Sequence, residues 1–134
     1  MKKIALVTGC STGIGRSMAL RLVKNGYVVF AGVRRIESIG TLANDNFIPV
    51  KLDVNKPEQI KAVIEDIKNK YNRIDLLINN AGYGAMGPVA EVPLEQIKNQ
   101  FSTNVFAPIA LAQAALPLLR NTDQAKVVNI GSVA

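Results

Sequence analysis

The sequence contains no histidine, no tryptophan and a single cysteine, Cys10, among its 134 residues. Without histidine, Ser–His and Cys–His catalysis, histidine-ligated zinc and an imidazole proton shuttle are excluded. One cysteine forms neither an intrachain disulfide nor a cysteine-rich metal site, so we expect no metal site. Any chemistry in this chain therefore depends on backbone groups, hydroxyls, amides and charged side chains other than imidazole.

Long apolar runs and clusters of one charge are also missing. The apolar residues 4–7 end at a Thr-Gly turn, which is too short for a signal peptide, and no run approaches 18 consecutive apolar residues. We therefore expect no membrane span and a cytoplasmic location. The net charge of +6 is scattered and aromatics make up only 5 %, so we expect no nucleic-acid partner. With 49 % hydrophobic residues, the chain has enough apolar material for a buried core.

Apolar runs typical of strands alternate with longer stretches of helical periodicity. We predict helices over residues 14–24 and 93 to about 119, a helix that starts at Pro57, and a short, weak helix over residues 36–43. Pro49 indicates an edge strand, and Pro108 is expected to kink the long helix. The predicted strands cover residues 4–8, 27–31, 47–52, 74–79 and 127–130.

This alternation predicts an α/β fold, a doubly wound (Rossmann) parallel sheet covered on both faces by helices. Right-handed crossovers give the strand order 3-2-1-4-5. No repeat, low-complexity tract or linker interrupts residues 1–134, so we expect a single domain.

A glycine-rich segment joins the first strand to the first helix. Glycines at such a junction allow a tight turn and a close approach to a pyrophosphate, which the helix N-terminus then stabilises. An ordinary glycine-rich turn is the alternative, but the position after strand one of a βαβ series favours dinucleotide binding. No Gly-Lys-Ser/Thr follows, so the segment is not a P-loop. It reads Thr8-Gly9-Cys10-Ser11-Thr12-Gly13-Ile14-Gly15.

Together with four later motifs, this segment resembles the short-chain dehydrogenase/reductase family over the whole chain. The four are Leu52-Asp53-Val54, Asn79-Asn80-Ala81-Gly82, Asn104 within residues 101–105, and Val128-Asn129-Ile130-Gly131-Ser132. The resemblance implies carbonyl reduction, or alcohol oxidation, by hydride transfer with a nicotinamide cofactor. It implies that Ser132 binds the substrate oxygen and that Asn104 anchors a water in a proton relay. It implies cofactor contacts from Gly9, Ser11, Thr12, Gly13, Ile14, Gly15, Asp53, Val54, Asn80, Ala81 and Gly82.

The end of the second strand indicates which coenzyme is used. An NAD enzyme usually carries an acidic residue there for the ribose 2′-hydroxyl, but this chain has Gly32 and no carboxylate before Glu37. Arg34 and Arg35 can bind a 2′-phosphate, so we expect NADP(H) in preference to NAD(H). Family alignment favours Arg34, with Arg35 as the alternative; both could also be solvated loop residues.

The proton-donating Tyr-x-x-x-Lys segment of the family does not occur in these 134 residues. We expect a chain that ends before that segment, lacks the C-terminal strands of the family, and binds cofactor without turnover. A non-catalytic dinucleotide-binding module or a redox sensor is the alternative function.

The apolar loop over residues 83–89 looks like the corresponding loop of reductases that act on steroids, retinol and acyl-dihydroxyacetone phosphate. It suggests a small-molecule carbonyl or alcohol substrate of lipophilic character, with Tyr83 and Met86 either lining the pocket or anchoring the loop. Because the long helix is a common subunit contact in the family, and because strand five should leave an unprotected edge, we also expect a homo-oligomer.

Overall fold

Five parallel strands form one sheet in the computed structural model, which describes residues 2–132. The strand order is β3-β2-β1-β4-β5, so the predicted doubly wound topology is confirmed. Pro49 lies in the edge strand β3, as expected from its missing N–H. The strands are β1 (Lys3–Val7), β2 (Tyr27–Val33), β3 (Phe47–Lys51), β4 (Leu76–Asn79) and β5 (Lys126–Asn129).

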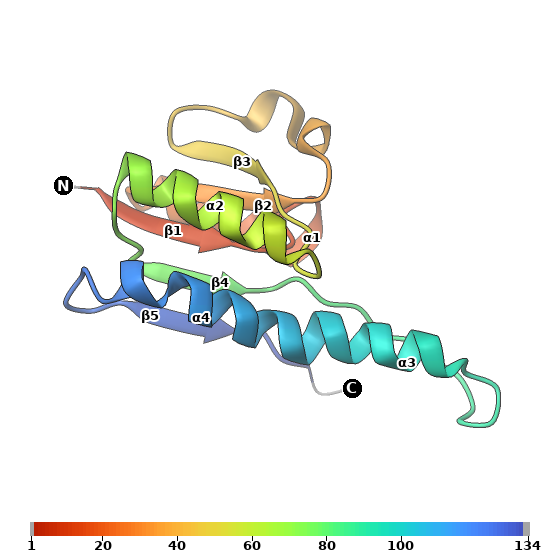
Figure 1. The fold of residues 1–134 in the computed structure, drawn as a ribbon. Coiled ribbons are helices and arrows are strands. Elements are labelled where there is room, and N and C mark those ends of the chain that lie inside the picture. The colour runs from red at the N-terminus through yellow and green to blue at the C-terminus, as the bar shows by residue number, and fades with distance from the viewer. Residues whose placement is uncertain (1, 133–134) are drawn as a thin grey trace.

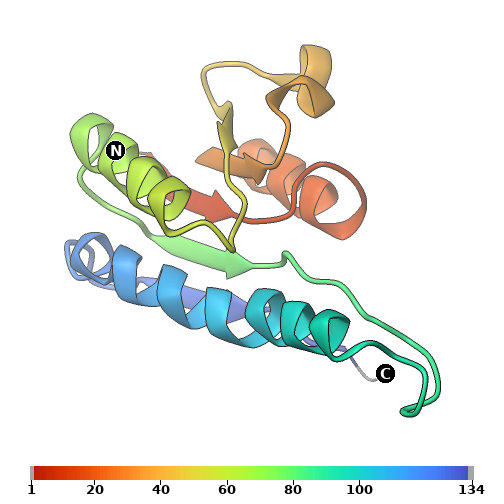
Figure 2. The same ribbon diagram turned by 45° about the vertical axis from the view of Figure 1, so that its right-hand side comes forward.

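Helices cover both faces of the sheet. Helices α2 (Pro57–Lys70) and α4 (Ala107–Leu119) lie side by side on one face, and α1 (Gly13–Lys24) lies on the other (Figures 1 and 2). Helix α3 (Leu94–Phe101) extends beyond the end of the sheet, together with the loop that leads into it (Figure 1). The weak helix predicted after β2 is a 310 helix, η1 (Ile36–Leu42).

Alternating side chains of each central strand enter two separate hydrophobic cores. In β1, Ile4 and Leu6 pack in the core beneath α2 and α4, whereas Ala5 and Val7 pack in the core beneath α1. All four are fully buried. A strand covered on both faces needs apolar residues at every position, which explains why the strands appear in the sequence as unbroken apolar runs.

The long helix is irregular on the N-terminal side of Pro108, where a proline is expected to disturb it. A π-helical turn, η2 (Ser102–Phe106), separates α3 from α4 and ends just before Pro108. Proline lacks an N–H and crowds the carbonyl four residues earlier, so the wider turn falls on its N-terminal side. The helix also contains Pro117, which the sequence analysis did not mark.

The bounds of all five strands differ from the prediction by one or two residues. Strand β4 begins at Leu76 rather than residue 74, and β5 covers Lys126–Asn129 rather than residues 127–130. The backbone N–H of Ile74 donates to the Leu118 carbonyl, 3.2 Å away, so this residue bonds to a helix end instead of a neighbouring strand.

Within residues 2–132, β5 forms the second edge of the sheet, and its Val127 and Val128 side chains are 43 % and 37 % exposed. The helical run Leu94–Leu119 is long and apolar enough to span a membrane. Core helices of globular proteins meet the same criterion of length and mean hydropathy. In the structure Leu111 and Ala115 of this run are fully buried in the core.

A buried carboxylate connects β1 to the segments that lead into β4 and β5, at the end of the sheet opposite the glycine loop. Asp75 accepts hydrogen bonds from the Ile4 N–H at 2.7 Å, from Thr122 Oγ1 at 2.9 Å and from Arg73 Nε at 3.0 Å. Burial raises the pKa of Asp75, but the hydrogen bonds from Arg73, Ile4 and Thr122 outweigh it and hold the pKa below its ordinary value. The carboxylate therefore stabilises the fold in its charged form.

Replacing Asp75 with asparagine should lower the free energy of unfolding by about 3 kcal/mol, because the Arg73 guanidinium loses its charged partner. The wild-type protein should lose this contribution as the pH falls below about 4, since protonation is easier in the unfolded chain. Urea unfolding at several pH values measures both effects. Asp66→Asn, which breaks the exposed ion pair with Lys70, is the matched control and should lower the free energy of unfolding by less than about 1 kcal/mol. Equal losses for the two variants would contradict this role.

Candidate functional site

The glycine loop between β1 and α1 is packed tightly against the segment after β4. Gly9 and Gly13 have φ angles of +70° and +61°, which favour glycine. A Cβ added at Gly15 would lie 2.2 Å from the carbonyl oxygen of Gly9 and 2.5 Å from Asn80 Nδ2. A Cβ at Gly9 would lie 3.0 Å from Ala81 Cα. The loop therefore needs glycine at these positions in order to reach this arrangement.

Thr8 connects the glycine loop to the segment after β4. Its Oγ1 accepts hydrogen bonds from the backbone N–H groups of Asn80 and Ala81, both at 2.9 Å, and donates to the Ile78 carbonyl at 3.5 Å. Asn80 Nδ2 donates in turn to the Gly9 carbonyl at 3.2 Å. These bonds hold the ends of two neighbouring strands in one arrangement.

A cavity of about 480 Å³ lies at the carboxyl ends of β1, β2 and β3. Doubly wound sheets bind ligands in this position, where the strand order reverses. Helix α1 starts beside the cavity with no acidic residue in its first turn and no side-chain cap from Thr12. Its N-terminal N–H groups therefore remain available to an anion. The lining includes eight of the residues predicted to contact the cofactor: Gly9, Ser11, Thr12, Arg34, Asp53, Val54, Ala81 and Gly82.

Five other predicted cofactor residues do not line this cavity; the fifth, Asn80, lines the second cavity described below. Gly13, Ile14 and Gly15 form the start of α1, where Gly15 is buried and Ile14 is 66 % exposed. The helical periodicity of residues 14–24 predicts Ile14 in one apolar stripe with Met18, Ala19, Leu22 and Val23, and its exposure shows that this expectation is wrong. Arg35 lines a separate hollow that also includes Arg34. Of the two arginines, only Arg34 reaches the wall of the nucleotide-sized cavity.

Asp53 has one oxygen engaged locally. Its Oδ1 accepts a hydrogen bond from the Asn55 N–H at 3.0 Å, which is the local turn expected of a strand-end aspartate. The Asp53 N–H itself donates to Gln59 Oε1 at 2.7 Å. The bond from Asn55 orients the carboxylate through Oδ1, and the bond to Gln59 holds the backbone of Asp53 beside the cavity.

A second, larger cavity of about 830 Å³ lies beside the first and shares Ala81, Gly82 and Tyr83 with it. Both residues expected to take part in chemistry, Asn104 and Ser132, line this second cavity. Residues far apart in the sequence are thus gathered around one hollow. Asn80, the remaining predicted cofactor residue, also belongs to its lining.

The side chain of Asn104 bonds to the backbone of Tyr83 through both its oxygen and its nitrogen. Its Oδ1 accepts from the Tyr83 N–H at 3.0 Å, and its Nδ2 donates to the Tyr83 carbonyl at 2.7 Å. Gln100 Oε1 accepts from the Ala85 N–H at 2.9 Å, one turn earlier in the helix. The helix thereby holds the loop that forms the floor of both cavities.

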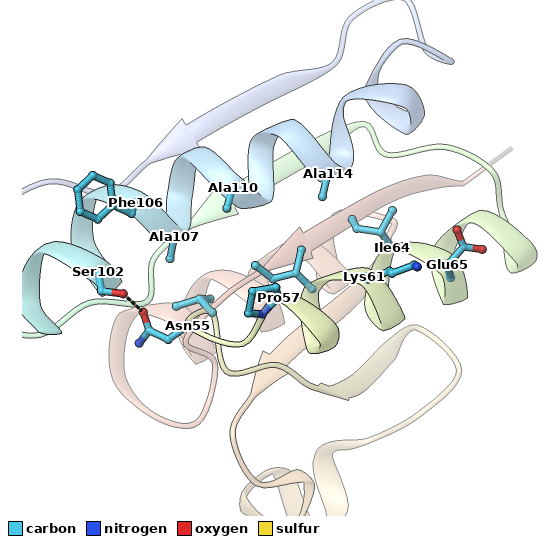
Figure 3. A pocket seen from close by; sticks show the side chains of 12 residues that line it. Asn55, Pro57, Lys61, Ile64, Glu65, Ser102, Phe106, Ala107, Ala110 and Ala114 are labelled. Carbon is cyan, nitrogen blue, oxygen red and sulfur yellow. Dashed lines mark hydrogen bonds between the residues drawn. The ribbon is translucent and has the colours of Figure 1, made fainter.

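Asn55 ties the segment after β3 to the π-helical turn that contains Asn104. Its Nδ2 donates to Thr103 Oγ1, and its Oδ1 accepts from Ser102 Oγ, both at 2.8 Å. Figure 3 shows the second bond at one end of an apolar hollow between α2 and α4. Pro57 and Ile64 on one helix line this hollow opposite alanines on the other, and neither Asn104 nor Ser132 belongs to it.

Cys10 lies inside the glycine loop with its side chain fully buried. Its Sγ donates to the Val7 carbonyl at 3.2 Å. Burial raises the pKa of this thiol to about 12, although a hydrogen bond from the backbone of Gly32 and the charge of Arg16 act in the opposite direction. The thiol is therefore neutral and unreactive at physiological pH.

Sequence reasoning missed three residues that build the site: Thr8, Asn55 and Gln100. Thr8 stood beside the first glycine and was treated only as part of the motif. The amides of Asn55 and Gln100 bond to residues 48 and 15 positions away, respectively. Only the Asp-Val-Asn order after strand three could have indicated a turn at Asn55.

Thr8→Val should lower the free energy of unfolding by about 2–3 kcal/mol, because it leaves the N–H groups of Asn80 and Ala81 without an acceptor. Thr8→Ser keeps the hydroxyl and loses only the methyl group, so it should lower the free energy of unfolding by about 1 kcal/mol. Urea denaturation of both variants measures the difference. A serine variant as unstable as the valine variant would show that the hydroxyl is not what matters.

Cys10 should resist thiol reagents at pH 8 in the native protein and react fully once the protein is unfolded in urea. Because its pKa is raised in the folded state, its contribution to stability is complete below pH 9 and is lost as the pH rises towards 12. In this range the free energy of unfolding of the wild-type protein should therefore fall by up to about 1.4 kcal/mol more per pH unit than that of Cys10→Ala. If the free energy of unfolding fell equally with pH in the two proteins, the result would contradict a buried, neutral thiol.

Comparison with known proteins agrees with this architecture. A family model described as short chain dehydrogenase matches residues 3–134. A probable short-chain type dehydrogenase/reductase, VdlC of Helicobacter pylori, is 39 % identical over 131 residues, which are 98 % of this chain and 48 % of that protein. An NADPH-dependent 1-acyldihydroxyacetone phosphate reductase of Saccharomyces cerevisiae is 36 % identical over 139 residues, covering 99 % of this chain and 46 % of that protein.

Among solved structures, a short-chain dehydrogenase from Streptomyces avermitilis superposes with a TM-score of 0.92 at 36 % identity, over 98 % of this chain and 50 % of that one. The chain thus spans about half the length of the relatives that it matches. The match covers the glycine loop, both cavities and every strand described above. The chain belongs to the short-chain dehydrogenase family of oxidoreductases.

Proposed function

We propose that residues 1–134 form a single NAD(P)-binding domain of an NADP(H)-dependent oxidoreductase that reduces a carbonyl or oxidises the corresponding alcohol. The observation that carries this proposal is the position of Arg34 in the wall of the nucleotide-sized cavity. No carboxylate stands between Gly32 and Glu37 to bind a ribose 2′-hydroxyl. A guanidinium in this place favours a 2′-phosphate.

The lining of the cavity fits such a cofactor. Glycines at the junction of β1 and α1 allow the backbone to approach a pyrophosphate, and the first turn of α1 carries no acidic side chain to repel it. Asp53 would meet the adenine amino group, and Arg34 would hold the 2′-phosphate. Ala81 and Gly82, which line both cavities, leave room for a cofactor that extends from one cavity into the other.

The second cavity would receive the reacting carbonyl. The bound nicotinamide supplies the hydride of this chemistry. Ser132 would hold the substrate oxygen, and Asn104 would keep the Tyr83 loop in place while anchoring a relay water. These 134 residues contain no Tyr-x-x-x-Lys segment, so we propose that by themselves they bind cofactor without turnover. The buried state of Cys10 gives no support to redox sensing through a thiol.

A lipophilic substrate is favoured by the walls of the second cavity. Val105, Ile109 and Ile130 contribute apolar surface to it, and Met86, at its rim, is 92 % exposed. The yeast relative is named for an acyl-dihydroxyacetone phosphate, and a Bacteroides thetaiotaomicron relative is named a 3-ketodihydrosphingosine reductase. Both names describe carbonyl compounds with long apolar chains.

Self-association is supported by exposed apolar side chains along the helical run Leu94–Leu119. Phe101 in α3, Phe106 in η2 and Leu116 in α4 are 52 %, 63 % and 41 % exposed. Exposed apolar residues that cluster on one helix are typical of a contact surface. We therefore propose that the protein forms a homo-oligomer that uses this helix.

Fluorescence titration with NADPH and NADH tests the coenzyme. The wild-type protein should bind NADPH more tightly, and Arg34→Ala should raise the Kd for NADPH by about ten- to a hundredfold while changing that for NADH little. Arg120→Ala, an equal change of charge at the exposed end of α4, is the matched control. Tighter binding of NADH by the wild-type protein would refute the proposed coenzyme.

A further inference from the structure

The segment that carries Arg34 is weakly attached to the rest of the protein. Residues 34–38 are all exposed, and within η1 only Ile39 is buried, at 3 % exposure. Arg34 and Arg35 have no hydrogen bond from their guanidinium groups to any residue within 2–132. Something else must therefore keep this segment against the cavity if Arg34 is to meet a ligand there.

Arg16, in the first turn of α1, makes the contact that bridges this gap. Its Nη2 donates to the carbonyl oxygen of Ser38 at 2.7 Å, and its Nε donates to the carbonyl oxygen of Cys10 at 3.5 Å. One guanidinium thus joins the glycine loop to the start of η1. No local sequence pattern shows that this arginine positions the segment, because the carbonyl groups that it contacts lie 6 and 22 residues away.

Ser38 completes the connection from the other side. Its Oγ lies 2.7 Å from the Arg35 carbonyl, to which it donates, and 3.5 Å from Ser11 Oγ in the glycine loop. The bond to Arg35 tightens the turn directly after the two arginines. Arg16 and Ser38 therefore hold the same segment at two points.

The charge of Arg16 is not compensated by a carboxylate. The ion pairs within residues 2–132 are Lys70–Asp66 and Arg73–Asp75, and both lie away from the glycine loop. Arg16 is half-buried and bonds to carbonyl oxygens only. A partly buried cation without a counter-ion raises the positive potential beside Arg34.

We propose that Arg16 and Ser38 are positioning residues for coenzyme selection: they hold residues 34–38 against the glycine loop, so that Arg34 stays in the cavity wall. This inference rests on the proposed preference for NADP(H). A 2′-phosphate uses Arg34 and the local positive potential, whereas a 2′-hydroxyl uses neither. Loss of Arg16 should therefore weaken the binding of NADPH far more than the binding of NADH.

The test compares Arg16→Ala, Arg16→Lys and Ser38→Ala with Arg21→Ala, which removes the same charge from an exposed position on the same helix. Hydrogen–deuterium exchange of residues 34–42 without cofactor measures how firmly the segment is held. Titration with NADPH and NADH measures selection between them.

Arg16→Ala should increase exchange in residues 34–42 severalfold and raise the Kd for NADPH about tenfold, with the Kd for NADH changed less than twofold. Arg16→Lys keeps the charge but cannot donate to both carbonyls in a planar fork, so it should recover only part of the NADPH affinity. Ser38→Ala should show a smaller effect in the same direction. Arg21→Ala should match the wild type in both measurements.

Unchanged exchange in Arg16→Ala would overturn the inference, whichever coenzyme the wild-type protein prefers. Equal losses for NADPH and NADH would also overturn it, because they would indicate general damage to the glycine loop. Tighter binding of NADH by wild type would instead refute the proposed coenzyme and, with it, a selective role for Arg16. The exchange measurement would then still decide whether Arg16 holds the segment.

Discussion

The hydroxyl of Thr8 joins the two strand ends on which both cavities depend. It bonds to the backbone after β4 at Asn80 and Ala81, while Asn80 returns a bond to Gly9. Such close contact is possible only because Gly9 and Gly15 have no side chain in the space between the two segments. The ends of β1 and β4 therefore form one rigid unit, and the cavities open on either side of it.

Polar side chains of the long helix extend this unit towards the second cavity. Asn104 holds Tyr83 by two bonds, and Asn55 links the segment after β3 to the π-helical turn next to Asn104. A π-helical turn widens the helix locally and is frequent at functional sites. The loop beside Asp53 is thus connected to the floor of the second cavity through a short chain of hydrogen bonds.

The strand order, the edge position of Pro49 and the glycine loop could all be predicted because they depend on short-range patterns. Apolar runs reveal strands buried on both faces, and crossover handedness then restricts their order. The irregularity predicted from Pro108 takes the form of a wider turn just before the proline, which the sequence pattern alone does not specify. The exposure of Ile14 was missed because helical periodicity assigns a face to the core without showing where the neighbouring layer ends.

The sequence by itself determined the family, the topology and the glycine loop between β1 and α1, since each follows from a local motif or from periodicity along the chain. Only the tertiary structure decided which polar side chains hold those motifs in place. Thr8 pairs with residues 72 and 73 positions away, and Asn55 with one 48 positions away. Arg16 likewise reaches Ser38 across 22 positions. Such pairs form because parallel strands bring their carboxyl ends to one edge of the sheet, a proximity that no short stretch of sequence encodes.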